Sequence, residues 1–158
     1  MRIVIGADHA GFALKNIVIR TLEAWGYDVE DNGTYDTTPV DFPLITREVC
    51  DPLRAGEYER GILICGTGVG ASIAANKLPG IRAALCHDVY SAHQCVEHDN
   101  ANVLCLGAQV VGDRLALDLV RTFLAAEWTN DPIFRRRVNQ LTELEQAVAD
   151  ELRPGTPS

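Results

Sequence analysis

The sequence contains a glycine-rich segment that opens with a cysteine, Cys65-Gly66-Thr67-Gly68-Val69-Gly70. The apolar run at 61–64 is typical of a buried strand, and residues 72–77 are typical of a helix. A glycine-rich turn between a strand and a helix gathers backbone N–H groups at the positive end of the helix dipole. A cysteine at that position is favoured as the thiolate, so the segment predicts a basic sulfur beside an oxyanion site.

The glycines alone do not identify the chemistry of this turn. Their spacing, Gly66-x-Gly68-x-Gly70, does not match the full dinucleotide fingerprint, and the turn belongs to the third strand–helix unit instead of the first. No Gly-Lys-Ser/Thr follows, which excludes a P-loop. A tight turn that serves only packing remains an alternative, as does a nicotinamide or flavin oxidoreductase that rests on this turn alone.

Other residues capable of chemistry flank the predicted strands. They are Asp8 and His9 after residues 2–6, His87 and Asp88 after residues 81–86, and His98, Asp99 and Asn100 before residues 102–107. We expect these side chains to surround one crevice with Cys65 and Thr67, because ligands of parallel sheets bind at the carboxyl ends of strands. A base, an acid and hydrogen-bond donors at one crevice suit proton abstraction next to a carbonyl, with no need for a metal.

Each candidate could instead serve only the fold. Asp8 is a suitable cap for the helix that follows, and His9 can stabilise its own loop. His87 lies at the start of a predicted helix. Three further cysteines, Cys86, Cys95 and Cys105, suit small hydrophobic positions in the core.

Composition narrows the function classes. The chain has 158 residues, a size typical of one domain, and a net charge of −8 without a basic stripe, which argues against nucleic acid as a partner. No apolar run approaches the ~20 residues needed to span a bilayer, and the chain opens with a strand pattern instead of a signal peptide. Five cysteines without a Cys-x-x-Cys or zinc spacing favour reduced thiols in the cytoplasm.

The rest of the pattern alternates strand-like runs with amphipathic helices. Predicted strands are 2–6, 27–31, 61–64, 81–86 and 102–107; predicted helices are 12–25, 42–53, 72–77, 87–97, 113–126 and 132–152. This order predicts an α/β fold, a Rossmann-like three-layer αβα sandwich with a five-stranded parallel sheet, as one domain over 1–152 with a flexible tail at 153–158. The last helix follows a sheet that is already covered, so we expect it to pack on a partner subunit.

Several segments together resemble the ribose-5-phosphate isomerase B / galactose-6-phosphate isomerase family. They are Ala7-Asp8-His9-Ala10-Gly11, the turn at 65–70, residues 74–77 and 79–83, and Ala101-Asn102-Val103-Leu104 with Gly107-Ala108 and Val111-Gly112. The resemblance extends to about residue 150 and implies an aldose–ketose isomerase that acts through a cis-enediol without metal or cofactor. Ribose 5-phosphate to ribulose 5-phosphate is the first reaction it implies. It also implies homodimers or dimers of dimers whose active sites lie at the subunit interface.

The resemblance assigns roles to matching residues. Cys65 looks like the base that moves a proton between C1 and C2, and Thr67 assists at the substrate oxygens. His98 looks like the acid that opens the sugar ring, with Asp8 as its partner at the anomeric hydroxyl. The implied substrate-binding residues are Asp8, His9, Gly66, Thr67, Gly68, Val69, Gly70, Asp99, Gln109 and Arg137, with Arg136 as a possible substitute.

Four positions depart from the family pattern. The family usually has Tyr at Phe42, Asn at Asp99, and Arg at both Gln109 and Ile133. Arginine binds phosphate through charge-assisted, often bidentate hydrogen bonds, so two such losses weaken the expected phosphate site. This leaves as alternatives a tetrose or hexose phosphate, or an unphosphorylated sugar of the allose/psicose type. A more remote alternative is a sugar-phosphate-binding module without catalysis.

Overall fold

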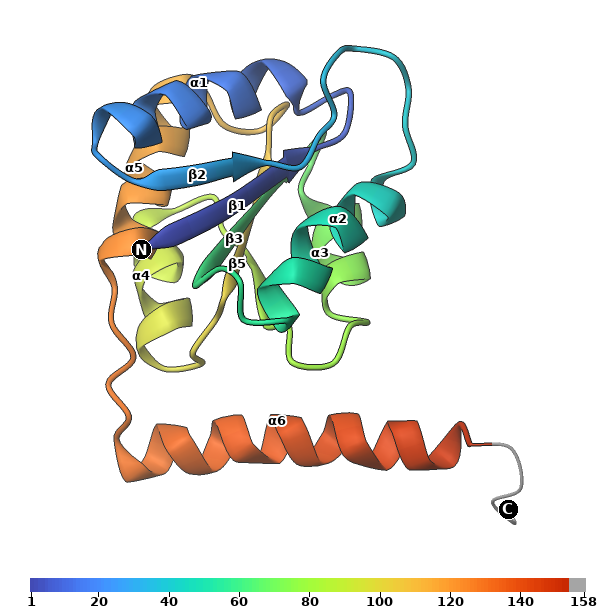
Figure 1. Cartoon of the computed structure of the whole chain (residues 1–158). Helices are drawn as coiled ribbons and strands as arrows, with labels where there is room; N and C mark the ends of the chain where they lie inside the picture. Colours follow the sequence, from blue (N-terminus) through green and yellow to red (C-terminus); the bar gives the residue numbers. More distant parts are fainter. Residues whose placement is uncertain (154–158) are drawn as a thin grey trace.

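The computed structural model describes residues 1–153 and contains one five-stranded parallel sheet between two layers of helices (Figure 1). The strand order is β2-β1-β3-β5-β4. The strands are β1 (Arg2–Ala7), β2 (Asp28–Asp31), β3 (Arg60–Cys65), β4 (Ala83–Leu85) and β5 (Val103–Gly107). The helices are α1 (Phe12–Ala24), α2 (Phe42–Arg54), α3 (Val69–Ala75), α4 (Val89–Glu97), α5 (Asp113–Ala125) and α6 (Pro132–Glu151). The predicted Rossmann-like three-layer sandwich is confirmed.

Side chains of the central strands alternate between two hydrophobic cores. Ile62 and Ile64 of β3 pack with the apolar faces of α1, α4 and α5, whereas Leu63 and Cys65 pack with α2 and α3. This alternation is the period-two pattern of a strand buried on both faces. The side chain of Cys65 therefore points to the α2–α3 side of the sheet.

The predicted boundaries of α3, β4 and α4 differ from the observed ones. Helix α3 begins at Val69 and not at Ser72, because Gly68 adopts a positive φ of 79° that turns the chain directly from the strand into the helix. Strand β4 covers only Ala83–Leu85, and α4 begins at Val89. The Asp88 carboxylate caps α4 by accepting the Ser91 N–H at 2.7 Å.

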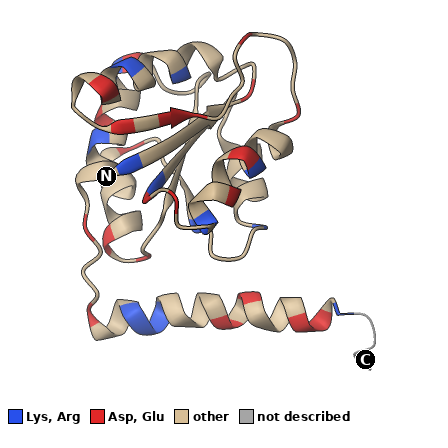
Figure 2. Cartoon of the chain, viewed as in Figure 1, with Lys and Arg blue, Asp and Glu red and all other residues tan. Residues whose placement is uncertain are grey.

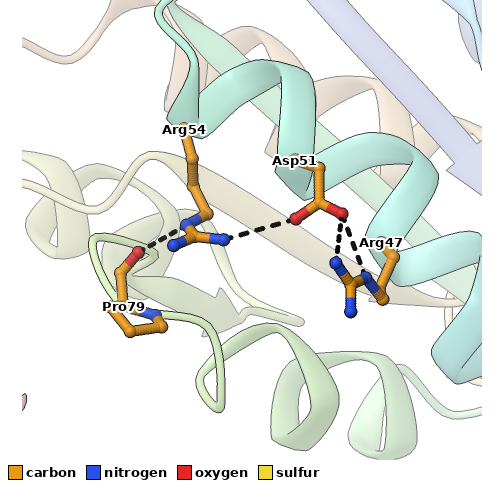
Figure 3. Close-up of polar contacts among 4 residues, drawn as sticks. All are labelled: Arg47, Asp51, Arg54 and Pro79. Carbon is orange, nitrogen blue, oxygen red and sulfur yellow. Dashed lines mark hydrogen bonds and ion pairs between the residues drawn. The ribbon is translucent and has the colours of Figure 1, made fainter. Parts of the chain in front are cut away.

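The surface of α2 is tied to the loop after α3 (Figure 3). Asp51 accepts hydrogen bonds from Arg47 and Arg54, and Arg54 Nε donates to the Pro79 carbonyl oxygen at 2.7 Å. These contacts hold the 76–80 segment against α2 on the same side of the sheet as Cys65.

Helix α6 belongs to neither helical layer of the sandwich and runs along one end of it (Figure 1). Asp131 caps its first turn by accepting the Ile133 N–H at 2.9 Å, and Pro132 occupies the first turn. Val138 is the one buried residue of this helix within the described chain, while Leu141, Leu144 and Val148 are exposed. Its packing on a partner stays a prediction, and the predicted flexible tail falls, beyond Arg153, outside the described residues.

Candidate active site

The glycine-rich turn that begins with Cys65 folds back over the Cys65 sulfur. Cys65 ends β3 and is 5% exposed, and the backbone N–H of Gly68 donates to its Sγ at 3.1 Å. Gly68 is required here, because a Cβ at this positive φ would lie 2.4 Å from Cδ1 of Leu85 and 2.9 Å from the backbone carbon of Leu106. The turn thus places a hydrogen-bond donor on the sulfur, an arrangement that stabilises developing negative charge.

The exposed rim of the turn carries two of the four departures from the family pattern. The Phe42 ring lies over Gly70, and a Cβ added at Gly70 would be 3.0 Å from that ring. The Gln109 amide lies over Gly66, and a Cβ added at Gly66 would be 3.1 Å from Gln109 Oε1. Thr67 is exposed between them, and its Oγ1 accepts the Val69 N–H at 3.3 Å. A ligand at this turn would therefore meet an aromatic ring, a neutral amide and a hydroxyl.

Asp8 and His9 lie beside this turn. The Asp8 N–H donates to the carbonyl of Ile64, the residue before Cys65, at 3.2 Å. Asp8 Oδ1 accepts the N–H groups of Ala10 and Gly11, so one carboxylate oxygen shapes the loop and Oδ2 has no protein partner in the described chain. His9 is exposed, and its Nδ1 accepts the Val40 N–H at 3.3 Å. The neutral His9 ring therefore carries its proton on Nε2, which is available to a ligand.

A buried lysine that sequence reasoning missed fixes the loop that reaches His9. Lys15 of α1 is fully buried, forms an ion pair with Asp31 and donates to the Thr34 carbonyl at 2.7 Å. These contacts anchor the start of the 32–41 segment, and Val40 near its other end contacts His9. The signal in the sequence is a lysine on the apolar stripe of a helix, next to Leu14 and Val18.

His87 has a structural role. It follows β4, and its Nε2 accepts the N–H of Gly107 at the end of β5 at 3.1 Å. This hydrogen bond joins the carboxyl ends of two neighbouring strands and supports the Leu85 and Leu106 walls of the turn.

His98, Asp99 and Asn100 do not share a crevice with Cys65 inside one chain, so that expectation is corrected. His98 is the C-cap of α4, and a helix that starts at the carboxyl edge of a parallel sheet ends at the amino edge. The next residues pair with the start of β3, where the Gly61 N–H donates to Asn102 O at 2.8 Å. Four residues of strand separate Gly61 from Cys65, about 13 Å at ~3.3 Å per residue.

The residues at the amino edge form their own cluster with the start of α6. The His98 ring stacks on Phe134 with 4.0 Å between centroids, and the Arg137 guanidinium lies 5.7 Å from the Phe134 centroid. Arg135, Arg136 and Arg137 form the basic stretch near the start of α6 (Figure 2). Ile133, in the first turn of α6, is exposed, and so is Asp99, the residue that follows His98.

The remaining cysteines are core residues. Burial raises the pKa of the Cys50 thiol to about 12 and the pKa of Cys105 well above its usual range, which favours the neutral thiol in both. Cys86 and Cys95 are buried in the other core, where their mutual hydrogen bond raises the pKa of Cys86 and lowers that of Cys95. The predicted core roles of Cys86, Cys95 and Cys105 are therefore confirmed.

Residues 1–153 lack two further kinds of feature. No group of three or more His, Cys, Asp or Glu side chains there is arranged to hold a metal ion. Within the same residues, no helix combines the length and apolar character that crossing a membrane requires.

Comparison of the chain with known proteins identifies its family. The sequence profile of the family described as Ribose/Galactose Isomerase matches residues 3–141. The chain belongs to the ribose/galactose isomerase family. It is 42% identical over 145 residues to ribose-5-phosphate isomerase B of Escherichia coli, covering 92% of this chain and 97% of that protein.

Two further relatives show the range of the family. A structure of Clostridium thermocellum ribose-5-phosphate isomerase B superposes with a TM-score of 0.92 at 47% identity, covering 94% of this chain and 99% of that one. D-erythrulose-4-phosphate isomerase 2 of Mycolicibacterium smegmatis is 41% identical over 152 residues, covering 93% of this chain and 99% of that protein. The predicted family is thus confirmed, and with it an aldose–ketose isomerase as the kind of enzyme.

Proposed function

We propose that this isomerase converts ribose 5-phosphate to ribulose 5-phosphate, with the Cys65 sulfur as the proton carrier. The observation that carries the proposal is the hydrogen bond from the Gly68 N–H to Cys65 Sγ at the carboxyl end of β3, beside the exposed Thr67. Its relatives named ribose-5-phosphate isomerase B support the choice of sugar.

The proposed chemistry moves one proton between neighbouring carbons. The Cys65 thiolate removes the proton on C2 of the open-chain aldose, and the C1 oxygen takes the negative charge of the resulting enediolate. The hydroxyl proton on O2 then passes to O1, and the Cys65 thiol returns the carbon-bound proton to C1, which gives the ketose and restores the thiolate. Thr67 and the backbone from Gly66 to Gly70 face the substrate oxygens and stabilise the enediolate. A polarisable sulfur suits removal of a proton from carbon, because the thiolate is the reactive form of cysteine.

We further propose that a complete site needs two chains. Cys65, Asp8 and His9 gather at one edge of the sheet, whereas His98 and Arg137 gather at the other. The exposed apolar residues of α6 suit a homodimer in which the partner's amino edge faces the Cys65 turn. In that assembly His98 of one chain opens the sugar ring, and His9 and Arg137 hold the phosphate.

A second substrate is supported by the residues at the rim. Gln109 and Ile133 replace two arginines of the family pattern, and Phe42 replaces a hydroxyl-bearing tyrosine. A relative at 41% identity is a D-erythrulose-4-phosphate isomerase, so a tetrose 4-phosphate is the second candidate substrate for this chain.

The test is a panel of sugars with ketose or aldose formation as the readout. The panel contains ribose 5-phosphate, a tetrose 4-phosphate, a hexose 6-phosphate and unphosphorylated ribose and allose. The proposal expects ribose 5-phosphate to have the highest kcat/KM and Arg137→Ala to raise KM for it about tenfold or more. A higher kcat/KM for the tetrose 4-phosphate would transfer the proposal to that substrate, and turnover of free sugars alone would contradict the phosphate site.

The cysteines support a reducing compartment. All five are free thiols and are buried, and none is paired in a disulfide within the described chain. We infer a cytoplasmic enzyme, because structural disulfides are rare and free thiols persist in that compartment.

A further inference from the structure

The imidazole of His98 is held on three sides by side chains that the family resemblance does not mention. The Gln94 amide nitrogen lies 3.0 Å from Nδ1, and the Phe134 ring stacks on one face at an interplanar angle of 8°. Glu97 Oε2 lies 3.6 Å from Nε2, which is too long for a hydrogen bond but within ion-pair range. His98 remains 30% exposed at its side chain, so the ring is oriented without being sealed off.

The contact with Gln94 selects one form of the ring. The amide nitrogen is a donor only, so Nδ1 accepts and the neutral imidazole carries its proton on Nε2. Nε2 points toward Glu97, whose carboxylate also lies 3.4 Å from His93 Nε2. The Nε2–H is therefore the group of His98 that can reach a substrate oxygen.

Phe134 links this ring to a basic residue one helical turn away. Its ring stacks on His98 at 4.0 Å, and the Arg137 guanidinium lies over it at 5.7 Å, within cation–π range. Phe134 and Arg137 are three residues apart on α6 and so share one face of that helix. One aromatic ring thus fixes the spacing between the proposed ring-opening acid and the proposed phosphate-binding arginine.

We propose that Phe134 and Gln94 are positioning residues that present the Nε2–H of His98 to the ring oxygen of a cyclic sugar phosphate. This inference rests on the proposed function and adds to it the two residues that fix the acid. Removing either contact frees the ring to rotate or to change tautomer, and proton donation becomes slower. The deprotonation step at Cys65 does not involve this cluster.

Sugar chemistry separates the two steps. Ribose 5-phosphate must open its furanose ring before C2 can be deprotonated. A tetrose 4-phosphate has no such ring to open, because its C4 hydroxyl is esterified.

The test uses the variants Phe134→Leu and Gln94→Leu. His93→Gln is the matched control, because this change removes a contact with Glu97 on the same helix without touching the His98 ring. Each is compared with the wild type on both substrates.

We expect Gln94→Leu to lower kcat/KM for ribose 5-phosphate about tenfold or more and to stay within about twofold of wild type on the tetrose 4-phosphate. Phe134→Leu should lower kcat/KM for both substrates, because Phe134 also contacts Arg137, but about tenfold more for ribose 5-phosphate than for the tetrose 4-phosphate. Phe134→Tyr, which keeps the stacking ring, restores the wild-type ratio, and the control is unchanged on both substrates. Equal losses on both substrates, or no loss on either, would overturn the proposal.

A second measurement does not depend on turnover. Long-range proton–nitrogen correlation NMR of the labelled protein reports which ring nitrogen of each of the four histidines carries the proton. We expect neutral His98, assigned by comparison with His98→Gln, to be protonated on Nε2, and Gln94→Leu to mix the two tautomers. A wild-type His98 protonated on Nδ1 would overturn the inference. Lack of turnover of ribose 5-phosphate by the wild type would instead contradict the proposed function.

Discussion

The backbone N–H of Gly68 donates to the sulfur of Cys65, three residues earlier, at 3.1 Å. This contact exists because Gly68 has a φ of 79°, which brings its amide back over the end of β3. Gly68 therefore turns the chain from β3 into α3 and also donates a hydrogen bond to the sulfur. One glycine thus serves both the fold and the proposed chemistry.

Gly68→Ala is expected to lose both stability and activity. Alanine at this φ is strained by about 1–3 kcal/mol, and its Cβ would also collide with Leu85 and the Leu106 backbone. Gly26→Ala is the matched control, because its φ is 86° and nothing lies within 4 Å of its added Cβ. Urea unfolding and kcat measure the two effects. If Gly68→Ala and Gly26→Ala were equally destabilised and both kept full activity, the turn would tolerate a side chain at residue 68, contrary to this prediction.

The buried pair of Lys15 and Asp31 is expected to respond unequally to its two neutralising changes. Lys15 is fully buried, whereas the Asp31 side chain is 31% exposed and can be solvated. Asp31→Asn strands a buried ammonium and should cost about 3–5 kcal/mol, while Lys15→Met should cost about 1–3 kcal/mol. Chemical denaturation measures both, with the double variant as a control for additivity. A larger loss for Lys15→Met would contradict this account.

The Asp88 cap is expected to make the stability of α4 depend on pH. The Ser91 N–H hydrogen bond is the main cause that lowers the pKa of Asp88, so the folded state favours its carboxylate. A lowered folded pKa gives stability that is present near neutral pH and disappears as the pH falls through that pKa. Asp88→Ala should therefore lower Tm near neutral pH, and the Tm difference from wild type should shrink as the pH falls through the lowered pKa of Asp88. A Tm difference that stays constant as the solution is acidified would mean that the carboxylate charge is not what stabilises the helix.

Dimers that contain one subunit of each of two inactive variants are expected to regain activity if the site spans two chains. Cys65→Ala and His98→Asn homodimers should each be nearly inactive on ribose 5-phosphate. After unfolding and refolding together, half of the dimers are mixed and one of their two sites is intact. About a quarter of wild-type activity should then return, as the symmetry of a homodimer requires. No recovery in mixtures that are shown to contain mixed dimers would contradict the two-chain site.

Much of this architecture could be predicted from local patterns. The period-two strand at 61–64 and the cysteine-led glycine turn indicate the right layer and the right edge, because strand and turn chemistry are local. The position of His98 depends on the path of α4, which starts at the carboxyl edge of the sheet and ends at the amino edge. The sequence pattern does not show this path. It therefore wrongly groups His98, which lies just before β5, with the residues that follow β3. The roles of Lys15 and Phe134 could not be predicted, because their partners lie far away in the sequence or on another helix.

The most direct test of the central claim is the activity of Cys65→Ala on the best sugar phosphate of the panel. Removing the sulfur removes the proton carrier, so kcat should fall more than about 100-fold while the fold is kept. Cys105→Ala is the control, since it removes a fully buried thiol from the same core as Cys65 and should lower stability but not kcat. A Cys65→Ala enzyme that keeps its rate within about tenfold of wild type would mean that another residue moves the proton.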